Sequence, residues 1–285
     1  MSVQPALVSV GIPTYNRPNG LRRTLACITA QTYANLEIIV SDNESPTAET
    51  ERVAREFMQR DSRVSFFRQQ PAVSISANFQ FVLRQASGEF FMWAADDDEW
   101  DPDFVRLCVN GFDAGNTVSV MPHMRTLYRV QGTDQRAADM PRLAGAQSTA
   151  QRMTAFLRCL TPSLFYGLHR RECILFFAAE RNWFDFYDCY FVLRLLSKGN
   201  IVILDPVLYT AGVDAEAYQV KAARRYRFLG LDYLNFFRSV SELITRAGMT
   251  LHERLWLRVR LALTVMRLFL WHEPRFLWQR IPRWR

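Results

Sequence analysis

Runs of β-forming residues alternate with helix-length segments through the first 120 residues, and this alternation restricts the fold more than any other feature. Segments with apolar residues at helical spacing, such as Leu21, Leu25 and Ile28, separate the runs. Parallel strands need a helical crossover, so the order predicts an α/β fold with a doubly wound, mostly parallel sheet. The expected strands are Leu7–Ile12, Leu36–Ser41, Val64–Arg68, Glu89–Ala95 and Val118–Met121.

The chain changes character after the fifth run. The segment Gln131–Ala150 is polar and short of aliphatic residues, which is typical of a mobile connection. We therefore divide the chain into residues 1–120, 121–214 and a helical extension over 215–285. Beyond the connection we expect helices over Thr149–Cys159, Trp183–Ser197 and Ala215–Ala247, and extended chain over Ser163–His169, Ile201–Leu204 and Val207–Thr210.

The net charge of +7 is concentrated near the C-terminus. Residues 252–285 contain eight arginines and two glutamates, a net charge of +6, which leaves +1 for residues 1–251. A nucleic-acid enzyme would more often carry its positive charge around the catalytic cleft. The asymmetry therefore argues against a nucleic-acid partner. It favours contact between the C-terminal region and an anionic surface, with membrane lipid as the leading candidate.

The apolar C-terminal segment Leu251–Trp271 is interrupted by four arginines, and its longest uninterrupted stretch is six residues. A membrane-spanning helix needs about 20 apolar residues, so we expect none here. Two readings remain open. One is an amphipathic helix on the membrane surface, because arginine and tryptophan together are typical of the headgroup level. The other is a helix packed on the body with a solvated arginine face.

The first residues predict a cytoplasmic protein, with a peripheral contact at the inner face of the membrane if the C-terminal helix binds lipid. The apolar stretch near the N-terminus spans about six residues without a basic flank, so it fits a core strand better than a secretory signal. The five cysteines lack the spacing of a zinc site and fit buried, reduced thiols.

Three consecutive carboxylates, Asp96, Asp97 and Asp98, directly follow the apolar strand that ends near Trp93. Packed together they repel one another, unless protons, hydrogen bonds or a cation compensate the charge. Hard oxygen ligands suit magnesium or manganese, which keep positions open for phosphate oxygens. An acidic loop that caps the helix starting near Asp101 is the alternative, and for a triplet considered alone it is the better one.

Two further loops favour the metal reading, because they deliver polar groups to the same edge of the sheet. The first run ends in Pro13, Thr14, Tyr15, Asn16 and Arg17, and the second ends in Ser41, Asp42 and Asn43. A tyrosine ring can stack on a base, and an aspartate can accept a base N–H. Neither loop is glycine-rich, which disfavours dinucleotide-dependent redox enzymes and P-loop hydrolases.

The chain resembles the family 2 inverting glycosyltransferases through four motifs in order. They are VSVGIPTYNRPNGLRRTLACITAQTY, LEIIVSDNES, SISANFQFVLRQASGEFFMWAADDDEW and FDFYDCYFVLRLLSKGNIVILDPVLY. The resemblance covers residues 7–120 well and 160–212 loosely. It implies a glycosyltransferase-A fold, a nucleoside-diphosphate sugar donor and a divalent metal, manganese or magnesium. Residues 1–120 would then be the donor-binding half, and 121–214 the acceptor-binding and catalytic-base half of one domain.

The resemblance also implies roles for single residues. Thr14, Tyr15 and Asp42 would hold the nucleoside, while Pro13 and Asn16 shape the loop. Aligned on Trp100, the acidic motif puts the metal carboxylate at Asp97 with Asp96 near the ribose. The commonest form of the motif has aspartate where this chain has Ala95, which leaves open whether Asp96 or Asp98 assists Asp97.

Inverting transfer also needs a base that deprotonates the acceptor hydroxyl. In the family this base is an aspartate that opens a helix about ninety residues after the metal motif. Asp188 fits that position, although Tyr187 replaces the usual acidic neighbour. Asp185 is the rival, with helix capping as its more ordinary role.

These features predict a metal-dependent inverting glycosyltransferase that moves a sugar to a hydroxyl of a glycan acceptor. We expect a role in cell-surface polysaccharide or lipopolysaccharide biosynthesis, with a lipid-linked acceptor at the inner leaflet. Two alternatives stay open. A nucleotidyltransferase would want a Gly-rich basic loop after the first strand, where this chain offers only Arg17 and Gly20. An inactive, partner-binding relative would have less reason to retain Asp42, Asp97 and Asp188.

Overall fold

The computed structural model describes residues 5–112, 115–128, 134–137, 140–141, 143, 148–213 and 229–280. The N-terminal half contains β1 (Val8–Thr14), α1 (Pro18–Thr29), β2 (Leu36–Asp42), α2 (Glu49–Met58), β3 (Val64–Arg68), α3 (Ile75–Gln85) and β4 (Phe90–Trp93). The middle contains β5 (Glu99–Trp100), α4 (Phe104–Asn110), β6 (Thr117–Tyr128), β7 (Asp134–Ala137), α5 (Thr149–Cys159), the 3-10 helix η1 (Pro162–Tyr166), β8 (Leu168–Arg170), α6 (Arg171–Ala178), α7 (Tyr187–Lys198) and β9 (Asn200–Val213). The helices α9 (Leu229–Arg246) and α10 (Leu251–Arg280) follow.

One sheet organises these elements, and nine strands belong to it within the described residues. Its order is β3-β2-β1-β4-β8-β6-β9-β5, with β7 paired to β6. The first four strands are parallel to one another, β6 and β9 are parallel, and β8 is antiparallel to both β4 and β6. The predicted α/β fold is confirmed, and the sheet is mixed, because β5 pairs antiparallel with β9 and β7 pairs antiparallel with β6 as well. The carboxyl ends of β1, β2 and β4 share one edge, where a ligand of such a fold binds.

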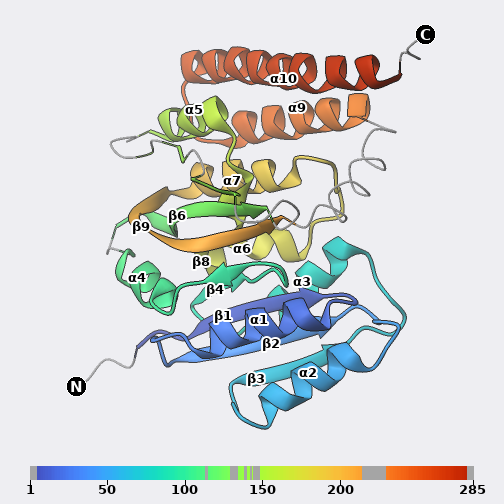
Figure 1. Cartoon of the computed structure of the whole chain (residues 1–285). Helices are drawn as coiled ribbons and strands as arrows, with labels where there is room; N and C mark the ends of the chain where they lie inside the picture. Colours follow the sequence, from blue (N-terminus) through green and yellow to red (C-terminus); the bar gives the residue numbers. More distant parts are fainter. Residues whose placement is uncertain are drawn as a thin grey trace.

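Continuous buried runs are typical of parallel strands that are covered on both faces, and β1 and β2 have this pattern. All seven residues of β1 are buried, and α1 lies in front of β1 and β2 with Leu21, Leu25 and Ile28 buried beneath it (Figure 1). Ser74 caps the helix α3, because its Oγ accepts the Ala77 N–H at 3.1 Å. These helices fix the strand ends that carry the polar loops.

An aromatic cluster around Trp93 joins the two halves of the sheet. The indole is fully buried at the end of β4, stacks on Phe165 with ring centroids 4.5 Å apart, and packs against Phe177 at 4.7 Å. Its Nε1–H donates to the Phe79 carbonyl at 3.0 Å, so the buried donor is satisfied. The acidic triplet therefore follows a rigid strand.

Two local expectations are wrong, and one helix was missed. Residues 163–169 are not extended throughout, because Pro162 opens the 3-10 helix η1 and only β8 pairs with the sheet. The polar segment 131–150, expected as a connection without a packed element, contains the strand β7, and half of the segment lies outside the described residues. The helix α6 was not expected from the sequence. In the predicted helix over 215–247, residues 215–228 lie outside the described residues, and α9 confirms the remainder.

The helices α5, α9 and α10 stack beyond the sheet, and α10 forms the outermost layer (Figure 1). Leu257 and Leu261 of α10 are fully buried, and the Thr264 hydroxyl donates to the Leu157 carbonyl of α5 at 3.1 Å. Packing of this helix on the body is thus confirmed. Among the described residues, none of the helices combines the length and apolar character required to cross a bilayer.

Candidate functional site

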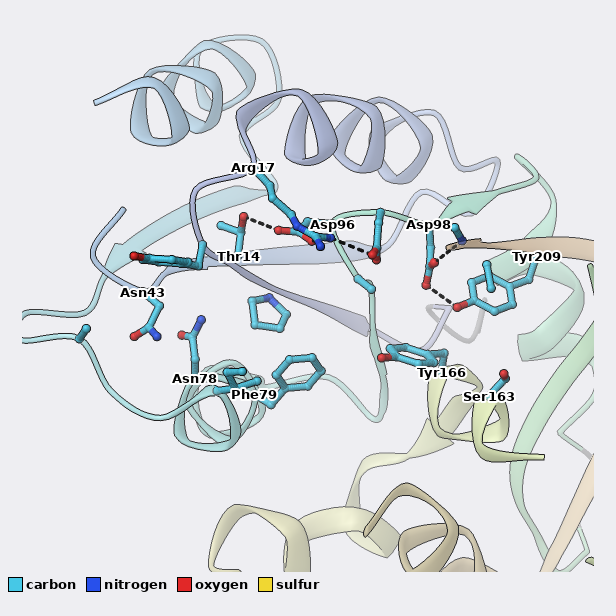
Figure 2. Close-up of a pocket in the computed structure, with 18 residues that line it drawn as sticks. Thr14, Arg17, Asn43, Asn78, Phe79, Asp96, Asp98, Ser163, Tyr166 and Tyr209 are labelled. Carbon is cyan, nitrogen blue, oxygen red and sulfur yellow. Dashed lines mark hydrogen bonds and ion pairs between the residues drawn. The ribbon is translucent and has the colours of Figure 1, made fainter. Parts of the chain in front are cut away.

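A pocket of about 610 Å³ opens at the carboxyl edge of the sheet (Figure 2). Its lining comes from the ends of β1, β2 and β4, the start of α3, η1 and β9. The lining residues are Pro13, Thr14, Tyr15, Arg17, Asn43, Ala72, Ile75, Asn78, Phe79, Ala95, Asp96, Asp97, Asp98, Ser163, Tyr166, Tyr209, Ala211 and Gly212. The volume lies within the range of small-molecule pockets, roughly 300–1,000 Å³.

Asp96 links the acidic loop to the end of β1. Its carboxylate accepts the Thr14 hydroxyl at 2.7 Å and the Arg17 Nη1–H at 3.1 Å. The side chain is almost wholly buried, and this burial raises the pKa of Asp96, while Arg17 and Thr14 act in the opposite direction. Two residues that the sequence assigned to one donor site, Thr14 and Asp96, are therefore in direct contact.

The guanidinium of Arg17 bridges two of the three carboxylates. Its Nη1 lies 3.1 Å from Asp96 Oδ1 and 2.8 Å from Asp97 Oδ2. The Asp97 side chain is 29% exposed and lines the pocket, whereas Asp96 lies deeper. A positive group thus already occupies the space between the two acids, which reduces the repulsion of like charges there.

Asp98 is held by β9 instead. One carboxylate oxygen accepts a short hydrogen bond from the Tyr209 hydroxyl, and the other accepts the Gly212 N–H at 2.8 Å. Burial, followed by the nearby charge of Asp97, raises the pKa of Asp98 to about 7. Both oxygens are engaged, so Asp98 fixes β9 against the acidic loop and closes this side of the pocket.

The helix α1 supports the acidic loop from behind. A Cβ on Gly20 would lie 2.0 Å from the Asp96 carbonyl oxygen, so glycine permits an approach that any other side chain would block. The Thr24 hydroxyl donates to the Ala95 carbonyl at 3.0 Å. The position of the triplet therefore depends on small and hydroxyl side chains of α1.

The loop after β1 shapes the opposite side. Pro13 and Tyr15 line the pocket, and the Tyr15 ring is 55% exposed, as a stacking platform requires. Asn16 adopts φ 52°, a left-handed conformation that asparagine tolerates, and its N–H donates to Ser45 Oγ at 2.7 Å. Asn16 is not among the described residues that line the pocket, so its observed contribution is to the turn.

Asp42 lies below the pocket lining. Its carboxylate is fully buried, accepts the Ser45 N–H at 3.1 Å and a short hydrogen bond from the Ser45 hydroxyl, and lies 3.6 Å from Arg68 Nη1. Its neighbour Asn43 lines the pocket instead. In this conformation Asp42 organises the loop that carries Asn43.

Asp188 lies in the first turn of α7, outside the described pocket lining. Its charge nevertheless acts on Tyr166 in the pocket wall: burial mainly raises the pKa of this phenol, and Asp98, Asp97 and Asp188 add to the increase. Phe186, just before the helix, has φ 74°, which is unusual for an aromatic residue. The rival Asp185 donates its backbone N–H to the Asp232 carboxylate on α9 at 3.2 Å.

Sequence reasoning missed several pocket residues. Ser163 and Tyr166 come from η1, Tyr209 comes from β9, and Phe79 comes from α3. Arg17 was noted only as a lone basic residue. Its place after the first strand, whose end lies beside the three acids, was a signal that the arginine would pair with them. No comparable signal marked Tyr209, because it lies 111 residues from Asp98 in sequence.

The carboxylates fit a divalent cation only in part. Among the described residues, no group of three or more His, Cys, Asp and Glu side chains could hold a metal ion by itself. Magnesium and manganese are often held by one or two carboxylates with phosphate oxygens and water completing the shell. Asp97 beside Asp96 matches that arrangement, provided that the ligand brings its own phosphate oxygens and Arg17 yields its position.

Comparisons with known proteins identify a family. A model of the family described as glycosyl transferase family 2 matches residues 9–171. A glycosyltransferase of Streptococcus pneumoniae, GlyA, is 35% identical over 99 residues, which are 35% of this chain and 14% of that protein. The GalNAc(5)-diNAcBac-PP-undecaprenol beta-1,3-glucosyltransferase of Campylobacter jejuni is 38% identical over 93 residues, 32% of this chain and 30% of that protein. The chain thus covers well under two thirds of these relatives.

Solved structures share the fold. Staphylococcus aureus TarS 1-349 in complex with UDP-GlcNAc superposes with a TM-score of 0.73 at 17% identity, over 92% of this chain and 72% of that one. The mannosyltransferase PcManGT of Pyrobaculum calidifontis, in complex with GDP-Man and Mn2+, gives 0.60 at 15% identity, over 92% and 74%. The architecture is therefore that of the glycosyltransferase-A fold, as the sequence predicted.

Proposed function

The chain belongs to glycosyl transferase family 2, and from this membership we propose that it is an inverting glycosyltransferase. It moves a sugar from a nucleoside-diphosphate sugar to a hydroxyl group of a glycan acceptor. The observation that carries the proposal is the contact of Thr14 with Asp96 beside Asp97, in a pocket at the carboxyl edge of the sheet. This arrangement unites a nucleoside loop and an acidic loop in one wall.

The donor lies along that wall. The exposed Tyr15 ring stacks on the base, and Thr14 with Asp96 forms the floor beneath the ribose. Asp42 contributes through the loop it holds, because its carboxylate is already engaged by Ser45. The structures of TarS with UDP-GlcNAc and PcManGT with GDP-Man support a nucleotide-sugar donor without selecting the base.

Asp97 is the carboxylate that holds the divalent cation, with Asp96 adjacent and Asp98 bracing β9. When bound, magnesium or manganese supplies positive charge to the departing diphosphate. Arg17 must then leave its bridge between Asp96 and Asp97, and its guanidinium is suited to a phosphate oxygen of the donor. The Mn2+ in the structure of PcManGT, which shares the fold, supports a divalent cation here.

Asp188 is the base that takes the proton of the acceptor hydroxyl. Inversion requires this base to lie across the sugar from the diphosphate. Two observations support the assignment. Asp188 lies in the first turn of α7, as the resemblance predicts for the base, and Phe186, directly before the helix, adopts a left-handed φ of 74°. The Asp185 N–H donates to the Asp232 carboxylate, which fixes the backbone of this rival and leaves the role of its carboxylate to mutation.

We place the reaction at the inner face of the cell membrane, in the synthesis of a surface polysaccharide or lipopolysaccharide with a lipid-linked acceptor. The Campylobacter relative, whose name specifies an undecaprenol-linked glycan, supports a lipid-linked acceptor. The basic, aromatic C-terminal region gives independent support. Residues 1–120 bind the donor and 121–214 the acceptor.

A panel of nucleoside diphosphates tests the proposal. We expect one of UDP, GDP and dTDP, with manganese, to raise the melting temperature, and the matching nucleotide sugars to release nucleoside diphosphate. A protein that binds a nucleotide sugar but never releases diphosphate with any acceptor would favour the inactive relative. Release of pyrophosphate from a nucleoside triphosphate and a sugar phosphate would favour a nucleotidyltransferase.

A further inference from the structure

The helix α10 carries two apolar faces, of which only one packs on the body. A helix turns by about 100° per residue, so Leu257, Leu261 and Thr264 lie on one side. All three are buried against α5 and α9. The opposite side carries an exposed apolar set, which we call the outward face: Leu255 (53% exposed), Val259 (61%), Leu263 (48%), Met266 (53%) and Leu270 (59%).

The outward face forms a stripe along the helix. Its five residues fall within an arc of about 80°, centred on the side opposite Leu261. Because α10 is the outermost layer of the molecule, the stripe faces away from the body (Figure 1). Each of the five residues is 48–61% exposed, and together they span about four turns of the helix. This is a continuous apolar patch, unlike single surface leucines, which need no explanation.

Arginines border the outward face on both sides. The helical spacing puts Arg258 along one border and Arg260 and Arg267 along the other. Two of these arginines are held in place by hydrogen bonds to neighbouring helices. Arg258 Nη2 donates to Thr245 Oγ1 of α9 at 2.7 Å, and Arg267 Nη2 donates to the Arg158 carbonyl of α5 at 3.2 Å. A guanidinium has five N–H donors, so further donors remain for phosphate.

We propose that the outward face of α10 docks on an anionic membrane surface, with the helix axis parallel to the bilayer. The five apolar side chains enter the boundary between headgroups and acyl chains, and the bordering arginines bind lipid phosphates. This proposal rests on the proposed function for its purpose, because it holds the pocket near a lipid-linked acceptor. It adds the surface and the orientation, which the net charge of the C-terminal region alone does not define.

The borders favour lipid over a second copy of the chain. Two copies that met through their outward faces would bring bordering arginines of both chains together, and like charges beside an apolar seam oppose pairing. Between residues 251 and 270 the sequence has one acidic residue, Glu253, whose carboxylate accepts the Thr250 N–H at 2.9 Å at the start of the helix. Phosphate groups provide the anions that a second copy does not.

Vesicle binding of the full chain tests the proposal. We expect the triple variant Val259→Gln/Leu263→Gln/Met266→Gln to bind phosphatidylglycerol-rich vesicles with an affinity lower by about tenfold or more than that of the unmodified protein, as measured by co-sedimentation. Three apolar side chains that would move from water into the lipid are then missing. Leu175→Gln is the matched control, since Leu175 is 45% exposed on α6, outside the outward face. Its vesicle binding should not change.

A second variant separates the electrostatic contribution to vesicle binding from the apolar contribution. Arg258→Gln/Arg267→Gln should abolish the preference for phosphatidylglycerol over phosphatidylcholine while the melting temperature stays within a few degrees. Equal vesicle binding by the triple variant would overturn the proposal. So would light scattering that shows a dimer of the unmodified protein dissolving into monomers in the triple variant, without any vesicle binding. Diphosphate release by the triple variant measures the transferase activity separately from vesicle binding. A failure of the docking proposal can therefore be distinguished from a failure of the proposed function.

Discussion

The guanidinium of Arg17 lies 2.8 Å from the carboxylate of Asp97, in the wall of the pocket where the donor diphosphate is proposed to bind. Asp97 is the proposed metal ligand, so the protein without donor neutralises it with an internal cation. The exchange of Arg17 for a metal ion then couples cation binding to the arrival of phosphate, because phosphate can accept the displaced guanidinium.

Removal of this internal cation should strengthen metal binding to the protein without donor. Arg17→Gln leaves Asp96 and Asp97 without their positive partner, and we expect the Kd for Mn2+ to fall by roughly tenfold. Titration calorimetry without nucleotide measures the change. Arg22→Gln is the control, because Arg22 lies on α1 and pairs with Glu56 of α2 at the surface, away from the acidic triplet. An unchanged Kd in Arg17→Gln would show that the guanidinium does not compete with the metal.

Gly20→Ala should damage both stability and donor binding. The new Cβ would lie 2.0 Å from the Asp96 carbonyl oxygen, so either α1 or the acidic loop has to move. We expect a loss of about 1–3 kcal/mol in the free energy of unfolding and weaker nucleotide binding. Gly248→Ala is the matched control, since nothing lies within 4 Å of its Cβ. Normal nucleotide binding in Gly20→Ala would mean that the loop position does not matter.

His169 should make stability depend on pH. Burial lowers the pKa of His169 from 6.5 to about 4, and its Nε2 bonds the Phe165 carbonyl at 2.9 Å. The unfolded chain takes up a proton near pH 6.5, whereas the folded protein stays neutral until about pH 4. The contribution of the neutral ring is therefore complete above pH 6.5 and is lost as the pH falls, by up to about 3 kcal/mol.

Urea unfolding at several pH values measures this effect. The unfolding free energy of the unmodified protein should fall more steeply between pH 6.5 and 4 than that of His169→Gln. Carboxylates titrate in both proteins, so the difference between the two slopes isolates the histidine. Identical slopes would contradict a buried neutral ring.

The sequence was most informative where elements are long and periodic. The strands β1 to β4 match the expected runs closely, because buried parallel strands are continuous apolar runs. The shared edge of β1 and β4 made the meeting of Thr14 and Asp96 predictable as well. Short strands such as β5, with two residues, carry no periodic signal and were missed.

Side-chain direction at a strand end was beyond sequence reasoning. Asp42 turns beneath its loop to Ser45 while Asn43 lines the pocket, and residue types alone do not distinguish these neighbours. The partnership of Asp98 with Tyr209 depends on the antiparallel pairing of β5 with β9, which residue order does not specify. Arg17 illustrates a third case, since its two ion pairs require the exact distance between loops.

Asp188→Asn should separate chemistry from binding. We expect unchanged affinity for the nucleotide sugar and a fall in kcat of about 100-fold or more, because general-base assistance is removed. Asp185→Asn should retain most of the activity. The reverse pattern, with Asp185→Asn inactive and Asp188→Asn active, would move the base to Asp185.

The most direct test of the account is diphosphate release from a nucleotide sugar with manganese, measured for the unmodified protein and for Asp97→Asn. Asp205→Asn, at an exposed site on β9, controls for loss of a carboxylate. We expect release by the unmodified protein and Asp205→Asn, and a loss of about 100-fold or more in Asp97→Asn, because charge stabilisation at the diphosphate is worth several kcal/mol. Near-normal release by Asp97→Asn would contradict the proposed donor site.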